Sequence, residues 1–166
     1  NTLFLYHGLG TGKTCSAIGI AEESRIFMKQ MGHNKKIIVI ASPNVRQNFR
    51  IQLFDERKLE QIDGIWNIES CVGNQLLNEI NPMNLMGYTR ERIIQQIRNI
   101  ILKSYLFMGY GEFANFIEKN INVSQDSGLS PEESKNRRFK NIRQVFNKRL
   151  IIIDEVHNLR LSDANK

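Results

Sequence analysis

A glycine-rich turn near the start of the chain could hold phosphate groups. In the stretch "FLYHGLGTGKTCSAI", glycines alternate with other residues and are followed by Lys13 and Thr14. Backbone N–H groups bind phosphate most closely where no Cβ obstructs the approach, and the start of a helix adds a favourable dipole. The pattern predicts a phosphate loop in which Lys13 reaches the β- and γ-phosphates of ATP and the Thr14 hydroxyl coordinates Mg²⁺. The expected nucleotide-binding residues are Gly8, Leu9, Gly10, Thr11, Gly12, Lys13 and Thr14.

This turn departs from the generic G-x-x-x-x-G-K-[ST] spacing at its first position, where His7 stands and Gly8 follows one place late. The alternative is a glycine-rich strand-to-helix turn that ends in Lys-Thr by chance. A lysine at a helix start is unfavourable against the helix dipole, however, so Lys13 indicates an anion. We assign no chemistry to His7.

Two adjacent carboxylates, Asp154 and Glu155, follow the apolar run Leu150-Ile151-Ile152-Ile153. We expect Asp154 to complete the Mg²⁺ site, usually through a water, and Glu155 to act as the general base for the water that attacks the γ-phosphate. Neighbouring residues of a strand point to opposite sides, so both carboxylates can serve one site only if the chain turns directly after Asp154. The alternative is an Asp-Glu helix cap without a metal.

Strands that alternate with helices would bring these two groups together, although Lys13 and Asp154 are 141 positions apart. Apolar runs predict strands at 2–6, 35–42, 64–71, 105–110 and 150–153, and helical periodicity predicts helices between them. The fold class is therefore α/β, with a mostly parallel sheet, helices on both faces and ligands beyond the carboxyl ends of the strands. The first helix is expected to turn seven residues inward: Ala17, Ile20, Ala21, Ser24, Phe27, Met28 and Met31.

His157 completes the sequence "DEVH", and "HGLGTGKT" with "DEVH" resembles motifs I and II of superfamily-two helicases, A-x-x-G-x-G-K-T and D-E-x-H. The segment 40–49 occupies the place of motif Ia, which contacts the nucleic-acid backbone in that family. With "YGEF" at 110–113, the chain looks most like the helicase-type early transcription factors and nucleoside triphosphatases of large nucleocytoplasmic DNA viruses. In this family the histidine that aligns with His157 couples the nucleotide site to the nucleic-acid-binding motifs.

This resemblance implies that residues 1–166 form a single RecA-like P-loop NTPase lobe, a fragment of a two-lobed motor. We expect ATP and Mg²⁺ as cofactors, Lys13, Asp154 and Glu155 as catalytic residues, and Thr14 with Asp154 at the metal. The implied partners are DNA or RNA, the second helicase lobe, and RNA polymerase or transcription factors. The implied location is the virion or host cytoplasm if the protein is viral, and otherwise the interior of the cell. Hydrolysis by the lobe alone is expected to be weak, because the arginine finger comes from the second lobe.

The excess positive charge is concentrated in one segment. The chain has 23 Lys and Arg against 17 Asp and Glu, a net charge of +6. Residues 135–149, "KNRRFKNIRQVFNKR", hold seven basic residues and no acidic one, and the rest of the chain is balanced at 16 against 17. This helix could lie against a phosphate backbone, or it could be a solvated face with Phe139, Ile142, Val145 and Phe146 in the core. The apolar spacing favours the solvated face.

Cys15 and Cys71 have no C-x-x-C or Cys/His spacing, which predicts neither a disulfide framework nor a zinc site and suggests a reducing compartment. No apolar run approaches the length of a membrane span, so no membrane partner is expected. Three other interpretations stay open: an AAA+ remodelling ATPase, a small-molecule kinase, and a structural protein that retains a decayed motor fold. The intact Lys13, Thr14, Asp154 and Glu155 argue against decay.

Overall fold

The computed structural model describes residues 2–5, 12–121 and 130–159. Its main sheet has three parallel strands in the order β4-β1-β5, where β1 is Ile37–Ile40, β4 is Tyr105–Met108 and β5 is Ile151–Ile153. Ile37 lies opposite Tyr105, and Ile38 lies opposite Ile151. All four residues of β1 are buried, as the uninterrupted apolar run predicts for a strand covered on both faces.

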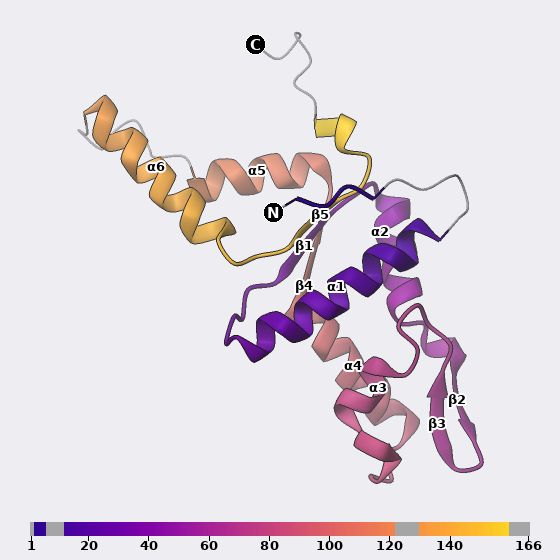
Figure 1. The fold of residues 1–166 in the computed structure, drawn as a ribbon. Coiled ribbons are helices and arrows are strands. Elements are labelled where there is room, and N and C mark those ends of the chain that lie inside the picture. The colour runs from indigo at the N-terminus through magenta and orange to yellow at the C-terminus, as the bar shows by residue number, and fades with distance from the viewer. Residues whose placement is uncertain (1, 6–11, 122–129, 160–166) are drawn as a thin grey trace.

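Helices connect these strands and cover the sheet (Figure 1). The α-helices are α1 (Lys13–Gln30), α2 (Pro43–Leu53), α3 (Gln75–Ile80), α4 (Arg90–Ser104), α5 (Tyr110–Ile121) and α6 (Pro131–Phe146). The 3-10 helices are η1 (Glu56–Lys58), η2 (Pro82–Asn84) and η4 (Val156–Leu159). The predicted alternation of strands and helices is confirmed for β1, β4 and β5 and for α1, α2, α4, α5 and α6, whereas α3 was not predicted.

The alternating side chains of β1 divide the core into two parts. Ile37 and Val39 pack with residues of α1, α2 and α4, whereas Ile38 and Ile40 pack with Met108 and with aromatic residues of α5 and α6. Because successive residues of a strand point to opposite faces, these two clusters lie on opposite faces of the sheet. The predicted α/β architecture with helices on both faces is therefore confirmed, and it is consistent with a RecA-like lobe whose described sheet is small.

A hairpin stands apart from the main sheet. Strand β3, Ile65–Ile68, confirms the strand predicted at 64–71, but it pairs antiparallel with β2, Leu59–Ile62, which the sequence analysis did not predict. The two strands form a separate sheet beside α3 and α4, away from the carboxyl ends of β1 and β5 (Figure 1).

Two expectations about apolar residues near the N-terminus are wrong. Residues 2–5 of the predicted strand 2–6 form no strand, and Leu3 and Phe4 are exposed. An apolar run becomes a strand only where a neighbouring strand supplies hydrogen bonds, and these residues have no ladder partner among the described strands. Phe27 in α1 and Met31 just after the helix face solvent instead of the core, and α1 buries a polar stripe that includes Glu22.

This polar stripe is a buried ion network. The Arg25 guanidinium donates to Glu22 and to Glu79, each at 2.7 Å, and the Tyr105 hydroxyl donates to Glu22. Burial alone would lower the pKa of Arg25, but the hydrogen bonds to the two carboxylates outweigh it and raise that pKa. Burial and the Glu22 carboxylate raise the pKa of Tyr105. Each buried charge therefore has a partner, which is the condition for keeping charges inside a protein.

The expectation that the two cysteines stay unpaired is wrong. The structure joins Cys15, in the first turn of α1, to Cys71, in the turn after β3, with their Cα atoms 5.1 Å apart. That separation is ordinary for a disulfide. Motif spacing could not reveal the pair, because 56 positions separate the two residues. They meet because the turn after β3 lies against α2, where the Cys71 N–H donates to the Gln52 carbonyl.

Replacing Cys71 by serine should lower the free energy of unfolding by about 2–4 kcal/mol in non-reducing buffer, because the cross-link restricts the unfolded chain. Urea unfolding followed by circular dichroism would measure the change. The same variant in dithiothreitol is the internal control, since both proteins are then without the bond and their stabilities should agree to within about 1 kcal/mol. An unfolding midpoint of the unchanged protein that does not move on addition of dithiothreitol would contradict the prediction.

In the part of the chain that the structure describes, no helix combines the length and the apolar character required to cross a membrane.

Candidate functional site

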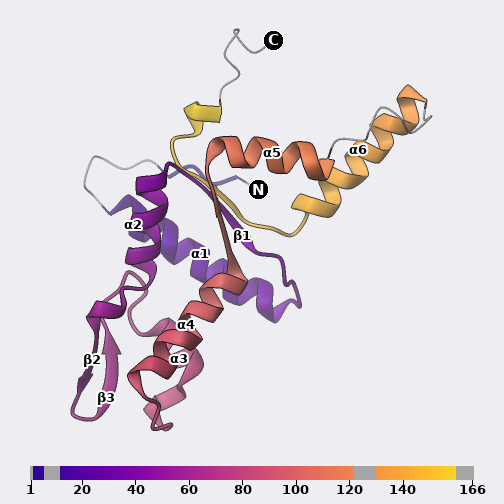
Figure 2. The same cartoon turned by 180° about the vertical axis from the view of Figure 1, so that it is seen from behind.

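The candidate site lies at the carboxyl ends of the parallel strands. The turn after β5, the start of α2 and the start of α5 gather at this end of the sheet, and α1 begins beside them (Figures 1 and 2). The turn after β5 contains Asp154 and Glu155 and is called the acidic turn below. It is held in place by a backbone hydrogen bond, in which the Asp154 N–H donates to the Ile40 carbonyl at 2.9 Å.

The first turn of α1 carries the described part of the predicted phosphate loop. Gly8, Leu9, Gly10 and Thr11 lie outside the described residues, so the loop itself stays a prediction. Gly12 caps α1 with φ +83, in the left-handed region that favours glycine. Lys13 and Thr14 begin the helix and are half-buried. A glycine at position 12 is thus required by the backbone, independently of any ligand.

The chain turns directly after Asp154, as the sequence analysis requires if both carboxylates are to serve one site. Glu155 has φ +47, and Val156–Leu159 then forms η4. Asp154 is half-buried and Glu155 is exposed, so they are no longer alternating members of an extended strand. His157, in η4, places its Nδ1 atom 3.3 Å from Glu155 Oε2. The three acidic-turn residues singled out from the sequence therefore form one local unit.

The charge of Lys13 reaches this acidic turn. Burial and the neighbouring Glu155 carboxylate raise the pKa of Asp154, and the Lys13 ammonium partly offsets this rise. This agrees with the position of the start of α1 at the same end of the sheet as the turn after β5. The raised pKa also means that the charged form of Asp154 is incompletely compensated, and a cation placed beside it would stabilise that form.

The donor set fits Mg²⁺. The described residues include no cluster of three or more His, Cys, Asp or Glu side chains suited to holding a metal ion. Mg²⁺ does not need such a cluster, because it usually takes one or two protein oxygens and completes its octahedron with water and substrate phosphates. The Asp154 carboxylate and the Thr14 hydroxyl are oxygen ligands of this kind.

Tyr110 is a site residue whose role the sequence analysis missed. Its hydroxyl donates to the Asp154 carbonyl at 2.8 Å, and the Asn158 side-chain amide lies 3.4 Å from the same hydroxyl. Tyr110 begins α5, so these contacts connect the end of β4 to the acidic turn after β5. The signal in the sequence was a tyrosine at the end of an apolar run. Hydrophobic periodicity alone would predict only that its ring packs against the core.

An ion pair joins the segment 40–49 to the "YGEF" segment at 110–113. Arg46, near the start of α2, donates to Glu112 at 2.8 Å, and Glu112 also accepts from the Gly109 backbone N–H. The Gly109 N–H first and the Arg46 charge second lower the pKa of Glu112. This pair fixes the relative positions of α2 and α5 at the same end of the sheet.

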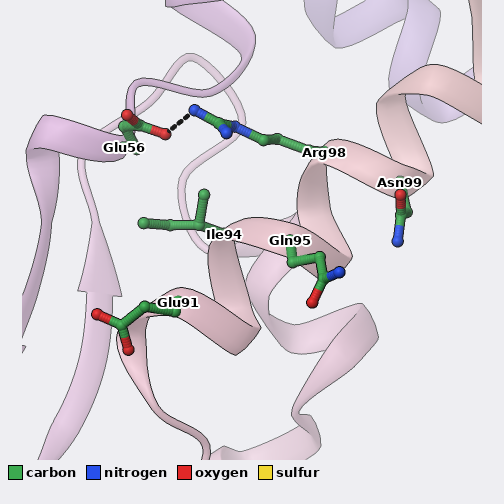
Figure 3. Close-up of a pocket in the computed structure, with 6 residues that line it drawn as sticks. All are labelled: Glu56, Glu91, Ile94, Gln95, Arg98 and Asn99. Atoms are coloured by element: carbon green, nitrogen blue, oxygen red, sulfur yellow. Dashed lines mark hydrogen bonds and ion pairs between the residues drawn. The ribbon is translucent and has the colours of Figure 1, made fainter.

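A pocket of about 420 Å³ on α4 does not belong to this site. Figure 3 shows its lining residues, which come from η1 and α4: Glu56, Glu91, Ile94, Gln95, Arg98 and Asn99. Arg98 is paired with Glu56, and Glu91 adds a further negative charge. A pocket whose guanidinium is already neutralised and which holds two carboxylates is poorly suited to binding phosphate.

The chain is similar to a protein of Acanthamoeba polyphaga mimivirus that is provisionally named an ATP-dependent RNA helicase. The two are 26% identical over 163 residues, which are 95% of this chain and 21% of the relative, so the chain spans about a fifth of that protein's length. No protein family model matches the chain, and no solved structure matches it. The similarity supports a helicase-related origin.

Proposed function

We propose that the chain is the ATP-binding lobe of a nucleic-acid-dependent ATPase of the helicase type. The observation that carries the proposal is the arrangement of the strand ends: the start of α1, which carries Lys13, lies at the same end of the sheet as the turn after β5, which carries Asp154. Support comes from the relative named as an ATP-dependent RNA helicase and from the resemblance of "HGLGTGKT" and "DEVH" to helicase motifs I and II. The pocket on α4 does not compete as a phosphate site, because its Arg98 is paired with Glu56.

Each residue of the proposed site has a distinct task. Lys13 carries positive charge toward the phosphates, and Thr14 with Asp154 holds Mg²⁺. The metal, when bound, neutralises charge on the phosphate oxygens. Glu155 accepts a proton from the attacking water, and its separation from Asp154 by the turn at φ +47 lets the two carboxylates perform different roles. His157, 3.3 Å from Glu155, is suited to transmit movements of η4 to that base.

The finer assignment rests on the resemblance. We infer that the chain belongs to superfamily two and that its protein works in viral transcription, with a second lobe that supplies the arginine finger. The mimivirus relative supports a viral setting for this kind of sequence. Without that finger we expect the chain to bind ATP and Mg²⁺ weakly and to hydrolyse ATP slowly.

Replacing Lys13 by alanine should weaken binding of a fluorescent ATP analogue with Mg²⁺ by at least about 10-fold, since charge-assisted hydrogen bonds are worth about 1.5–3 kcal/mol. Fluorescence titration would measure the affinity. Lys103→Ala, which removes an exposed lysine from α4, is the matched control and should bind like the unchanged protein. Equal affinities for the two variants would refute the nucleotide site.

A further inference from the structure

The basic helix α6 has a surface that the nucleotide site does not use. Figures 1 and 2 show α6 extending away from the sheet beyond the end of α5. It is anchored near its C-terminal end: Phe146 packs edge-to-face against Phe113 and Phe116, with ring centroids 6.3 and 6.5 Å apart, and the Asn141 side chain donates to the Ile121 carbonyl. Residues 135–140, which lie nearer the start of the helix, are exposed.

The exposed surface of α6 is cationic. Lys135, Lys140 and Arg143 are exposed. None of them takes part in an ion pair with another residue that the structure describes. The acidic residues of α6 lie in its first turn, and Glu133 accepts from the Ser130 N–H and hydroxyl in a capping box. The carboxylate of Glu133 is thus directed at the helix start and away from the basic residues.

Phe139 stands in the middle of these charges. It was expected in the core, but 54% of it is exposed, and this expectation is wrong. Residues four apart on a helix lie on one strip, so Lys135, Phe139 and Arg143 form a row, with Lys140 in the adjacent row. The row spans about 12 Å at 1.5 Å per residue. An exposed aromatic ring between cations offers a surface on which a planar group can stack beside negative charge.

We propose that the face formed by Lys135, Phe139, Lys140 and Arg143 binds single-stranded nucleic acid, with phosphates on the three cations and a base stacked on Phe139. Single-strand binding surfaces combine positive charge along the backbone with aromatic side chains on which bases stack. A duplex keeps its bases stacked inside and offers Phe139 no free ring. The inference extends the proposed nucleic-acid-dependent function, but it rests on α6 alone and requires no nucleotide.

Fluorescence anisotropy with labelled 20-nucleotide oligo(dT) and oligo(U), measured without ATP, tests the proposal with two separable changes. Phe139→Ala should weaken binding about 5- to 100-fold with an unchanged salt dependence, because stacking carries no charge. The triple variant Lys135→Ala, Lys140→Ala, Arg143→Ala should reduce the slope of log K against log salt by about 2, since each phosphate contact on a single strand contributes about 0.7.

Matched controls remove the same kinds of group elsewhere. Phe27→Ala removes an equally exposed ring from α1, and the double variant Lys103→Ala, Lys119→Ala removes exposed lysines from α4 and α5. Both should bind the oligonucleotides like the unchanged protein. Far-ultraviolet circular dichroism and thermal melting confirm that each variant is folded.

Three results would overturn the proposal. The first is that Phe139→Ala binds the oligonucleotides as tightly as Phe27→Ala does, and the second is that a 20-base-pair duplex binds more tightly than either single strand. The third is that the α6 variants lose binding to phosphatidylserine vesicles while their oligonucleotide binding is unchanged. The last result would assign the face to a membrane surface. Because the assay contains no ATP, failure here leaves the Lys13 result intact, and Lys13→Ala should bind oligonucleotides normally.

Discussion

Replacing Glu155 by glutamine is expected to slow ATP hydrolysis by about 10²- to 10⁴-fold, the usual effect of losing a general base. Glutamine has nearly the same shape and still accepts a hydrogen bond, but it cannot take a proton from water. Binding of ATP and Mg²⁺ should change by less than about 3-fold, because Thr14 and Asp154, and not Glu155, are proposed to hold the metal. A slower chemical step with intact binding is the signature of a residue that acts only in the transition state.

Single-turnover hydrolysis of radiolabelled ATP, with protein in excess over nucleotide, is the suitable measurement, because the lobe alone is expected to turn over slowly. Glu118→Gln, an exposed glutamate on α5, is the matched control and should retain the rate of the unchanged protein. Asp154→Asn should differ from both by weakening the Mg²⁺-dependent part of nucleotide binding. If Glu155→Gln hydrolyses ATP within about 3-fold of the control, the general-base assignment is wrong.

The elements that carry this site follow from short-range patterns. The strand at 37–40 was predicted from an uninterrupted apolar run that ends at Pro43, and the helix at 90–104 from its helical periodicity. The turn after Asp154 was predicted by a requirement of chemistry: adjacent strand residues point to opposite sides, so both carboxylates can face one site only if the strand ends between them. The φ of Glu155 confirms the turn. Local rules of this kind need no knowledge of distant residues.

The features that were missed depend on distant partners. Cys15 and Cys71 pair because the turn after β3 folds back against α1 and α2, and Tyr110 reaches Asp154 because the ends of β4 and β5 lie at the same edge of the sheet. Phe139 has helical spacing for a core residue, but α5 covers only the part of α6 near Phe146. No local pattern specifies where a neighbouring helix ends, so the exposed face of α6 could not be read from the sequence.

The inward face of α1 was misjudged for a related reason. Hydrophobic periodicity assigns the core to apolar residues, yet α1 buries Glu22 and Arg25 and exposes Phe27. The charges are tolerated because Tyr105 and Glu79 complete their hydrogen bonds from other elements. This network links α1, which follows the proposed phosphate loop, to β4 and α3, so its integrity bears on the position of Lys13.

Arg25→Ala is therefore expected to lower the free energy of unfolding by about 3–5 kcal/mol, because it leaves the fully buried Glu22 carboxylate without its cation. Lys29→Ala is the matched control: Lys29 pairs with the same Glu79 at 2.7 Å but is exposed, and its loss should cost less than about 1 kcal/mol. Urea unfolding followed by circular dichroism gives both values.

The double variant Glu22→Leu, Arg25→Met separates the charge from the packing. It removes both buried ions and should be less destabilised than Arg25→Ala alone, since a buried pair can often be replaced by apolar residues at little cost whereas a single buried charge cannot. If Arg25→Ala and Lys29→Ala were equally stable, Glu22 would have found another partner or water. If instead the double variant were the least stable of the three, α1 would be held against β4 by the packing of the Glu22 and Arg25 side chains and not by the pairing of their charges.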